Sequence, residues 1–252
     1  MNGFKLSESK SKNSIRFSRR AVKEFYVGTS GWYYSWNEDG SFDWFAKNSR
    51  LNAVELNSSF YRFPLQNTIK SWAEKGVKLR WAIKVNRSIT HTFKFNESAY
   101  ERWKKFHLLF DPLEENIDLF LFQLPPFMTP KLSPTIEKFI RKSGLREKFA
   151  LEVRNIQWYD KKWIDWASSL GITWVSLDSP DLPSDVFNVN GIVYERMHGR
   201  KVWYSHLYSD KELREVLEKI LNAKPKKAYV FFNNNHDMLT NSRKMLNMFN
   251  EM

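Results

Sequence analysis

The stretch VGTSGWYYSW, residues 27–36, ends a short apolar run with a Gly-Thr-Ser-Gly turn and places four large aromatic rings in the five residues that follow. The residues that lead into it, Glu24–Gly28, have the composition of a β-strand. Glycines at positions 28 and 31 permit backbone positions that larger residues resist. The stretch therefore predicts a first strand that ends in a turn, with a loop of aromatic rings beyond it.

Seven more runs of this kind follow, and longer segments with helical periodicity separate them. Helices are predicted over 42–49, 65–75, 97–109, 159–170 and 236–250, and two more begin at Ser133 and Ser209 and extend to the residue before Gly144 and to Ile220. This alternation indicates parallel βα units. The eight predicted strands are Glu24–Gly28, Ala53–Leu56, Arg80–Val85, Ile117–Gln123, Phe149–Val153, Thr173–Leu177, Ile192–Met197 and Ala228–Phe232.

The segment 178–191 breaks the alternation, because Pro180, Pro183 and Gly191 favour a loop where a sixth helix would be expected. Eight strands over residues 24–252 predict a single α/β domain, a (β/α)8 TIM-barrel-like fold with parallel strands in which the helix after strand six is missing or reduced. A doubly wound open sheet is the alternative. In both folds, ligands bind at the carboxyl ends of the strands.

The formal charge of the chain is +12, and residues 1–23 contribute half of it, with seven Lys and Arg against Glu8. This segment has almost no apolar pattern and is expected to be a basic, flexible tail. Its charge makes nucleic acid one candidate partner. The chain has no cysteine, no secretory signal and no apolar run of about 18 residues, so we expect a cytoplasmic protein with no membrane partner.

Polar side chains stand at the carboxyl end of every predicted strand. Because side chains alternate along a strand, Glu55 and Asn57 share one face, and so do Glu152 and Arg154. These faces are expected to point into the barrel mouth. The candidate substrate-binding residues are Thr29, Ser30, Trp32, Asn57, Tyr61, Lys84, His91, Gln123, Arg154, Trp158, Asp178, Arg196, Arg200, Asn233 and Asn234.

Three residues are the candidates for catalysis. Glu55 and Glu152 could form a carboxylate pair that works as general acid and base, and the pKa of His198 can be tuned by nearby carboxylates. A structural ion-pair network that fills the mouth is the alternative. With Asp178, the same three residues could hold a divalent metal, although no local spacing typical of metal ligands supports it. No nucleotide-cofactor motif is present.

Seven motifs, in order along the chain, resemble those of the YecE-like family, known as domain of unknown function 72. They are VGTSGWYYSW, VELNSSFYRFP (54–64), WAIKVNRSITH (81–91), FLFQLPPF (120–127), LEVRNIQW (151–158), YERMHGR (194–200) and YVFFNN (229–234). The resemblance implies a TIM-barrel-like fold with a polar pocket and no established activity. This chain has Asn155 and Gln157 where the family pattern has His and Ser, and Glu195 where an apolar residue is usual.

The residues at the strand ends favour an enzyme, a hydrolase or lyase that binds a small anionic or polyhydroxylated compound such as a sugar phosphate or nucleotide. A nucleic-acid-binding or processing protein is the second hypothesis, based on the charge and the aromatic rings. A protein that binds a ligand without turning it over is the third.

Overall fold

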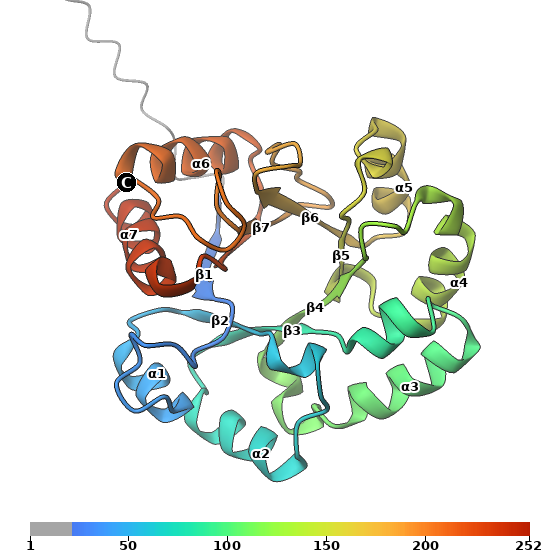
Figure 1. The fold of residues 1–252 in the computed structure, drawn as a ribbon, viewed down its shortest axis with the longest axis horizontal. Coiled ribbons are helices and arrows are strands. Elements are labelled where there is room, and N and C mark those ends of the chain that lie inside the picture. Colours follow the sequence, from blue (N-terminus) through green and yellow to red (C-terminus); the bar gives the residue numbers. More distant parts are fainter. Residues whose placement is uncertain (1–21) are drawn as a thin grey trace, which may run out of the picture.

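The structure is a computed structural model, and it describes residues 22–252, in which eight parallel strands lie inside a ring of helices (Figure 1). The strands are β1 (Glu24–Thr29), β2 (Ala53–Leu56), β3 (Arg80–Lys84), β4 (Ile117–Gln123), β5 (Phe149–Glu152), β6 (Thr173–Asp178), β7 (Ile192–Met197) and β8 (Lys227–Phe232). Their order is β1-β8-β7-β6-β5-β4-β3-β2, and a bridge between Ser30 and Glu55 joins the two ends. The predicted TIM-barrel-like fold is confirmed, and the open sheet is wrong.

The helices are α1 (Phe42–Asn48), α2 (Gln66–Lys75), α3 (Glu97–Leu108), α4 (Ser133–Ser143), α5 (Lys161–Ser169), α6 (Asp210–Asn222) and α7 (Met238–Asn250). Residues 179–191 contain no helix, as their prolines predicted, and the ring of helices in Figure 1 has a gap between α5 and α6. The capping box predicted at Ser209 and Glu212 is present at the start of α6.

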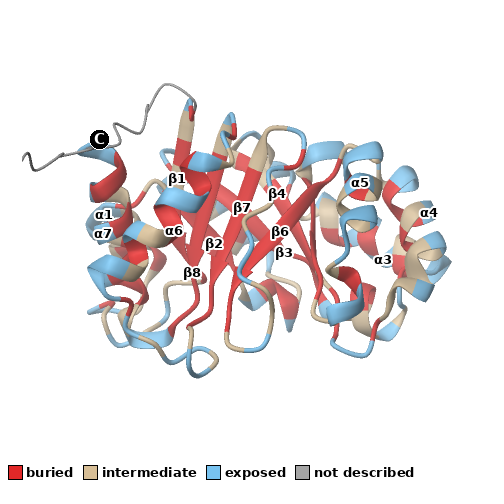
Figure 2. Cartoon of the chain, turned by 90° about the horizontal axis from the view of Figure 1, so that it is seen from above, coloured by how far each residue is buried: buried red, intermediate tan, exposed pale blue. Residues whose placement is uncertain are grey.

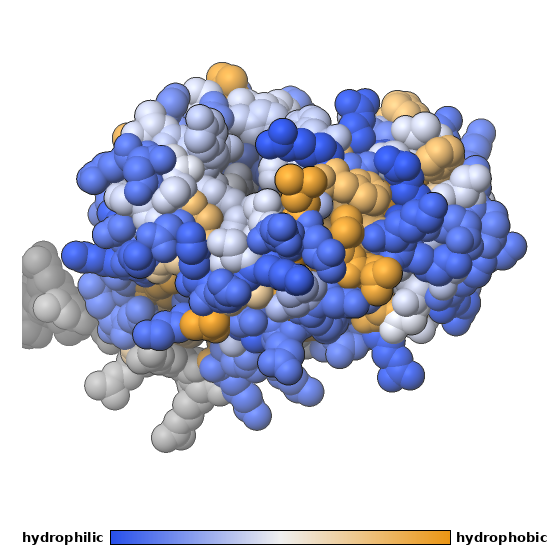
Figure 3. All heavy atoms as spheres, turned by 90° about the horizontal axis from the view of Figure 1, so that it is seen from below, coloured by the Kyte–Doolittle hydropathy of each residue, from blue (hydrophilic) through white to orange (hydrophobic). Residues whose placement is uncertain are grey.

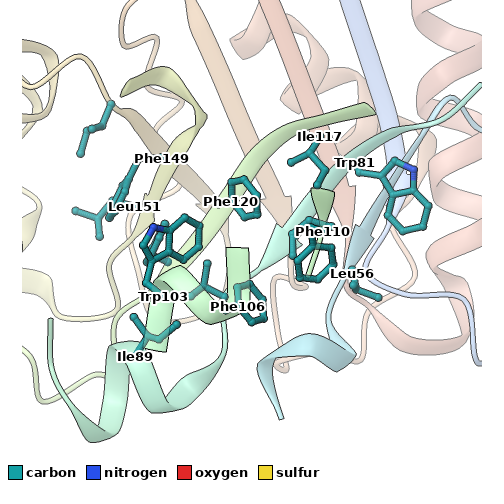
Figure 4. Packing of buried hydrophobic residues seen from close by; sticks show 14 of the residues in the cluster. Leu56, Trp81, Ile89, Trp103, Phe106, Phe110, Ile117, Phe120, Phe149 and Leu151 are labelled. Carbon is teal, nitrogen blue, oxygen red and sulfur yellow. The ribbon is translucent and has the colours of Figure 1, made fainter. Parts of the chain in front are cut away.

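Two apolar layers hold the barrel together. The outer layer lies between strands and helices, where Trp103 and Phe106 of α3 pack toward Phe120 of β4 (Figure 4). The inner layer fills the barrel with small and aromatic side chains, among them Ala53, Ala82, Ala150, Leu121, Tyr194 and Phe231. Buried residues accordingly follow the strands and the inner sides of the helices (Figure 2). The barrel interior is thus a packed core up to the level of its mouth.

The seam between β1 and β2 is closed by a side chain. Asn52 accepts a hydrogen bond from the Val27 N–H at 2.7 Å and donates one to the Phe25 carbonyl at 2.9 Å, so it satisfies backbone groups that a neighbouring strand would otherwise pair. Gly28 lets the two strands approach, because a Cβ at this position would lie 2.4 Å from the Ala53 carbonyl oxygen.

The barrel begins slightly before the predicted domain boundary. Val22 is buried, and the Lys23 N–H donates to the Lys226 carbonyl at 2.9 Å, although both were expected to belong to the tail. The rest of the predicted tail, residues 1–21, lies outside the described residues. Within residues 22–252, no helix combines the length and the apolar character that a membrane span requires.

The surface is mixed. On the side shown in Figure 3, hydrophilic side chains cover most of the area and hydrophobic ones gather near its centre. Four exposed aromatic side chains stand in loops that follow strand ends: Tyr33, Tyr61, Phe127 and Tyr204. These rings are therefore placed around the mouth of the barrel rather than in its core.

Glu195 is a buried carboxyl group on the outer side of β7, between the inward residues Tyr194 and Arg196. It is 2 % exposed, and its Oε2 has no hydrogen-bond partner among residues 22–252. Burial, and then the negative charge of Asp178, raise its pKa well above the ordinary value. The folded protein therefore holds Glu195 as a neutral acid at pH values where the unfolded chain has released the proton.

We expect Glu195→Gln to stabilise the protein at pH 7 by about 1–3 kcal/mol, because it removes the cost of keeping this acid protonated. The folded state binds more protons than the unfolded state above the ordinary pKa of Glu, so the free energy of unfolding of the wild type falls as pH rises from there. The gain from Glu195→Gln should shrink toward pH 4. Urea unfolding at several pH values measures this, and a gain that does not depend on pH would contradict it.

Candidate functional site

Four charged residues from three strands form a buried network at the mouth of the barrel. The guanidinium of Arg196, on β7, holds Glu55 of β2 through Nε to Oε2 at 2.8 Å and Nη2 to Oε1 at 2.6 Å. Its Nη1 donates to Glu152 at the end of β5, which also accepts from Nε of Arg154. Arg196 and both carboxylates are fully buried. The residues predicted to point into the mouth do so, and they pair with one another.

Glu55 is saturated by hydrogen bonds. Besides the two from Arg196, it accepts one from the Ser30 hydroxyl at 2.6 Å and one from the Tyr194 hydroxyl. Four donors on two carboxylate oxygens leave no site for a proton or a metal ion. Glu55 therefore positions Arg196, and its predicted role as acid or base has no support in this arrangement.

Glu152 is a fixed anion. Burial opposes its ionisation, but the positive charges of Arg154, Arg196 and Lys84 outweigh burial and lower its pKa to about 2. A group with such a pKa does not donate protons near neutral pH. Glu152 can accept hydrogen bonds and balance positive charge, which differs from the acid role considered for it.

His198 is held as a neutral imidazole. Its Nε2 lies 3.1 Å from Nη2 of Arg154 and 3.1 Å from Nη1 of Arg196. Guanidinium groups only donate, so Nε2 accepts and the ring proton is on Nδ1. Burial, and then the charges of Arg154 and Arg196, lower the pKa of His198 well below its ordinary value. Nδ1 has no partner among the described residues, so it is a buried donor available to a ligand.

Lys84 lies at the end of β3, beside the network. Unlike those of Arg154 and Arg196, its charged group makes no hydrogen bond to any of residues 22–252. It is 8 % exposed, and its Nζ lies 4.4 Å from the centre of the Phe60 ring. Burial, and then the positive charge of Arg196, lower its pKa to about 7. A free amine of this pKa can take up and release protons at neutral pH.

Asp178 and Arg200 belong to a second cluster beside the network. Arg200 Nε donates to Asp178 Oδ2 at 3.1 Å, and its Nη1 donates to Glu215 of α6 at 2.8 Å. The Tyr208 hydroxyl donates to the other Asp178 oxygen at 2.9 Å. Arg200 is thus tied to α6. It does not join Arg154 and Arg196, although all three were predicted to bind substrate.

The loops after β1 and β2 enclose a pocket of about 380 Å³. Its lining includes Ser30, Trp32 and Asn57 of the predicted set, together with Tyr34 and the Trp72 ring of α2. Trp32 packs edge-on against Trp72, with ring centres 5.3 Å apart. The rings of this loop thus both pack against the core and form part of the pocket wall.

Several other predicted residues lie around or below the mouth. Tyr61 is exposed, Gln123 is half-buried, and Asn233 is buried at the end of β8. The Thr29 hydroxyl donates to the Gly31 carbonyl at 2.6 Å and so shapes the first turn. The ring of His91 lies 5.2 Å from Phe60, and burial, with the charge of Arg87, lowers the pKa of His91 to about 4.

Two predicted binding residues serve the framework instead. Trp158 is fully buried, donates its Nε1–H to the Met128 carbonyl at 2.8 Å, and packs on Trp163. It lies in the outer core because the short helical turn after β5 directs it there. Asn234 donates to Asn241 of α7 at 2.8 Å and ties the loop after β8 to that helix.

Three residues that complete these clusters are absent from the predicted set. Tyr194 could have been found, since it shares a strand face with Arg196 and His198. Trp203 stacks on the Arg154 guanidinium with the ring centre 4.6 Å away, and Tyr208 reaches Asp178. Both lie in the long loop between β7 and α6, where no periodicity indicates which side chains turn back.

The proposed metal ligands do not form a ligand set. Among residues 22–252, no group of three or more His, Asp and Glu side chains is arranged to hold a metal ion. The reason is the arginines, because Arg196 occupies Glu55 and part of Glu152 and, with Arg154, occupies Nε2 of His198. The divalent metal considered from the sequence has no support here.

Comparisons with known proteins agree with this fold. The family model described as "Protein of unknown function DUF72" matches residues 26–252. A DUF72 family protein from Enterococcus faecalis V583 has a similar structure, with a TM-score of 0.78 and 20 % identity over 90 % of this chain and 95 % of that chain. One from Thermotoga maritima MSB8 has a TM-score of 0.75 and 24 % identity over 90 % and 99 %. No curated protein matches.

Proposed function

The chain belongs to the DUF72 family of proteins of unknown function, and on that premise we propose that it is an enzyme, a hydrolase or lyase acting on a small anionic or polyhydroxylated compound at the barrel mouth. The observation that carries the proposal is the free amine of Lys84 beside the guanidinium network. The other ionisable groups of the network are engaged with one another. Lys84 therefore takes the acid–base role for which Glu55, Glu152 and His198 were considered.

The charge balance of the mouth supports an anionic substrate. Glu55 and Glu152 carry two negative charges, which Arg154 and Arg196 balance. Nε of Arg154 donates to Glu152, and Nη2 donates to Nε2 of His198. Nη1 of Arg154 has no hydrogen-bond partner among residues 22–252. A carboxylate or phosphate beside Nη1 would gain charge-assisted hydrogen bonds. It would also stabilise a positive charge that develops at Lys84 during the reaction.

We expect Lys84→Met to lower any turnover by about 10²–10⁴-fold, because it removes the buried amine whose pKa is about 7. Screening phosphoesters, glycosides, nucleotides and phosphorylated carbonyl compounds would reveal the substrate class. If Lys84 is the base, the rate should rise with pH through about 7, as the amine loses its proton. Arg154→Lys should mainly raise KM, since the lysine ammonium lacks the planar fork of N–H groups with which a guanidinium binds an anion.

Lys201→Met is the matched control, because Lys201 is an exposed lysine in the loop after β7. It should leave turnover unchanged. Turnover that survives Lys84→Met would contradict the assigned role. Tight binding of a ligand without turnover would favour the non-catalytic alternative.

Binding of single-stranded nucleic acid is the second candidate, favoured by the exposed rings of Tyr33, Tyr61 and Phe127 in loops after strand ends. Lys94 lies over the Phe127 ring at 5.6 Å, which places a cation beside one of them. Rings next to cations suit stacked bases and a phosphate backbone. On this hypothesis, affinity should fall at least about tenfold between about 50 and about 200 mM salt, and Tyr61→Ala should weaken it. Retention on oligonucleotides that does not depend on salt would contradict it.

A further inference from the structure

We propose that the Lys84 amine forms a Schiff base with a carbonyl compound that carries an anionic group, such as a 2-oxo acid. This inference rests on the proposed enzymatic function of the same site and names the chemistry of its substrate. Schiff-base formation requires a neutral amine, a carbonyl carbon that can reach it, and a group that holds the substrate in place. The surroundings of Lys84 meet the first of these requirements, and Arg154 meets the last.

The neutral amine is favoured by the surroundings of Lys84. The side chain is 8 % exposed and its Nζ faces the Phe60 ring at 4.4 Å, with no hydrogen bond to any residue in 22–252. An ammonium ion there would have few partners for its three N–H groups, and a cation–π contact replaces only part of its lost hydration. The amine keeps its lone pair, which no neighbouring donor occupies.

The charges nearby have the same effect. The carboxylates of Glu55 and Glu152 are already balanced by Arg154 and Arg196, so a positive charge on Lys84 would be the excess charge of the cluster. An incoming anionic group would supply the missing balance and would stabilise an iminium ion once it formed. The site therefore suits a neutral amine before reaction and a cation after it.

The holding group is Arg154, whose Nη1 has no hydrogen-bond partner among the described residues. A carboxylate or phosphate on Nη1 would lie beside the network that also surrounds Lys84, whose charge acts on Glu152 and His198. The substrate class is thus a compound with a carbonyl group and an anionic group close to each other.

The reaction balances without an added oxidant or reductant. The Lys84 nitrogen attacks the carbonyl carbon, its lone pair forms the C–N bond, and the carbonyl π electrons move to oxygen. A proton passes from nitrogen to that oxygen and gives a carbinolamine. Loss of the hydroxyl group with one more proton releases water and leaves an iminium ion. The iminium ion can accept the electron pair of a breaking carbon–carbon bond, which is lyase chemistry.

The test is reductive trapping on the full-length protein. Pyruvate is incubated with the protein, borohydride is added, and the modified lysines are mapped by mass spectrometry of peptides. We expect adduct at Lys84 to exceed that at any other lysine on the order of tenfold. Its yield should rise with pH and reach half of its maximum near about 7. Lys84→Arg should abolish this adduct, whereas Lys201→Arg should retain it.

Adducts confined to exposed lysines, with the Lys84 peptide unmodified in the wild type, would overturn the inference, and this result needs no variant that might misfold. Lactate, an anion of the same shape without the carbonyl, separates the inference from the proposed function. In a second outcome, lactate stabilises the wild type more than Arg154→Lys, while pyruvate gives no adduct at Lys84. That result would overturn the Schiff base and leave the anion-binding site supported. If lactate neither stabilises the protein nor competes with pyruvate, and pyruvate is not trapped at Lys84, both proposals fail.

Discussion

Arg196→Ala should destabilise the protein by about 3–5 kcal/mol, the range for removing one partner of a buried ion pair. The substitution leaves the carboxylates of Glu55 and Glu152 buried without the guanidinium of Arg196, which pairs with both of them. It also removes a hydrogen bond from His198 Nε2. The mutant can lower the cost only by binding protons to the carboxylates or by admitting water. Urea unfolding followed by far-UV circular dichroism measures the loss.

The loss should depend on pH. In the wild type, the depressed pKa of Glu152 contributes stability that is present above the ordinary pKa of Glu and is lost as pH falls toward about 2. Arg196→Ala removes part of that contribution, so the two proteins should differ least under acid conditions. Arg80→Ala is the control, since Arg80 pairs with Asp118 but is partly exposed, and it should cost about 1 kcal/mol or less. An equal loss in both variants would refute the special role of Arg196.

Gly28→Ala should cost about 3 kcal/mol or more, because a methyl group would meet backbone rather than a movable side chain. The added Cβ would stand 2.4 Å from the Ala53 carbonyl oxygen and 2.9 Å from the Phe231 ring. Strands β1 and β2 would have to separate, and Asn52 would lose its bonds to Val27 and Phe25. Hydrogen exchange should show faster opening of the amides of β1 in the mutant.

Gly144→Ala isolates the effect of space from the effect of backbone conformation. Gly144 has φ +67° after α4, and nothing lies within 4 Å of the Cβ it would gain. Its substitution should cost only about 1 kcal/mol, the strain of a left-handed alanine. If Gly28→Ala is no worse than Gly144→Ala, the close approach of β1 and β2 does not limit the barrel.

The strands and helices could be predicted from the sequence because each follows from local rules. Short apolar runs with β-strand composition predicted the strands, and Pro180 and Pro183 predicted the missing helix. The direction of the polar side chains at the ends of β2 and β5 also followed, since Glu55 and Glu152 alternate with apolar neighbours. The family motifs added independent support, and the match over residues 26–252 confirms them.

The partners of these side chains could not be predicted, because they depend on which strands face each other across the barrel. Sequence spacing does not reveal that one guanidinium, Arg196, spans both carboxylates, or that Arg200 turns to Glu215 on α6. Those pairings decide which group remains free. The acid–base role that we propose therefore moves from His198 to Lys84, for which the sequence predicted only substrate binding.

The network around Arg196 has a further consequence for the reaction that we propose beside it. In water, solvent dipoles must turn as charge develops in a reacting molecule, and this reorganisation is part of the activation barrier. Here the charged groups are covalently attached to three strands and held in place by one another, so they are oriented before a substrate arrives. The ion pairs of the mouth thus also provide a preorganised polar environment, which does not have to reorient as charge develops.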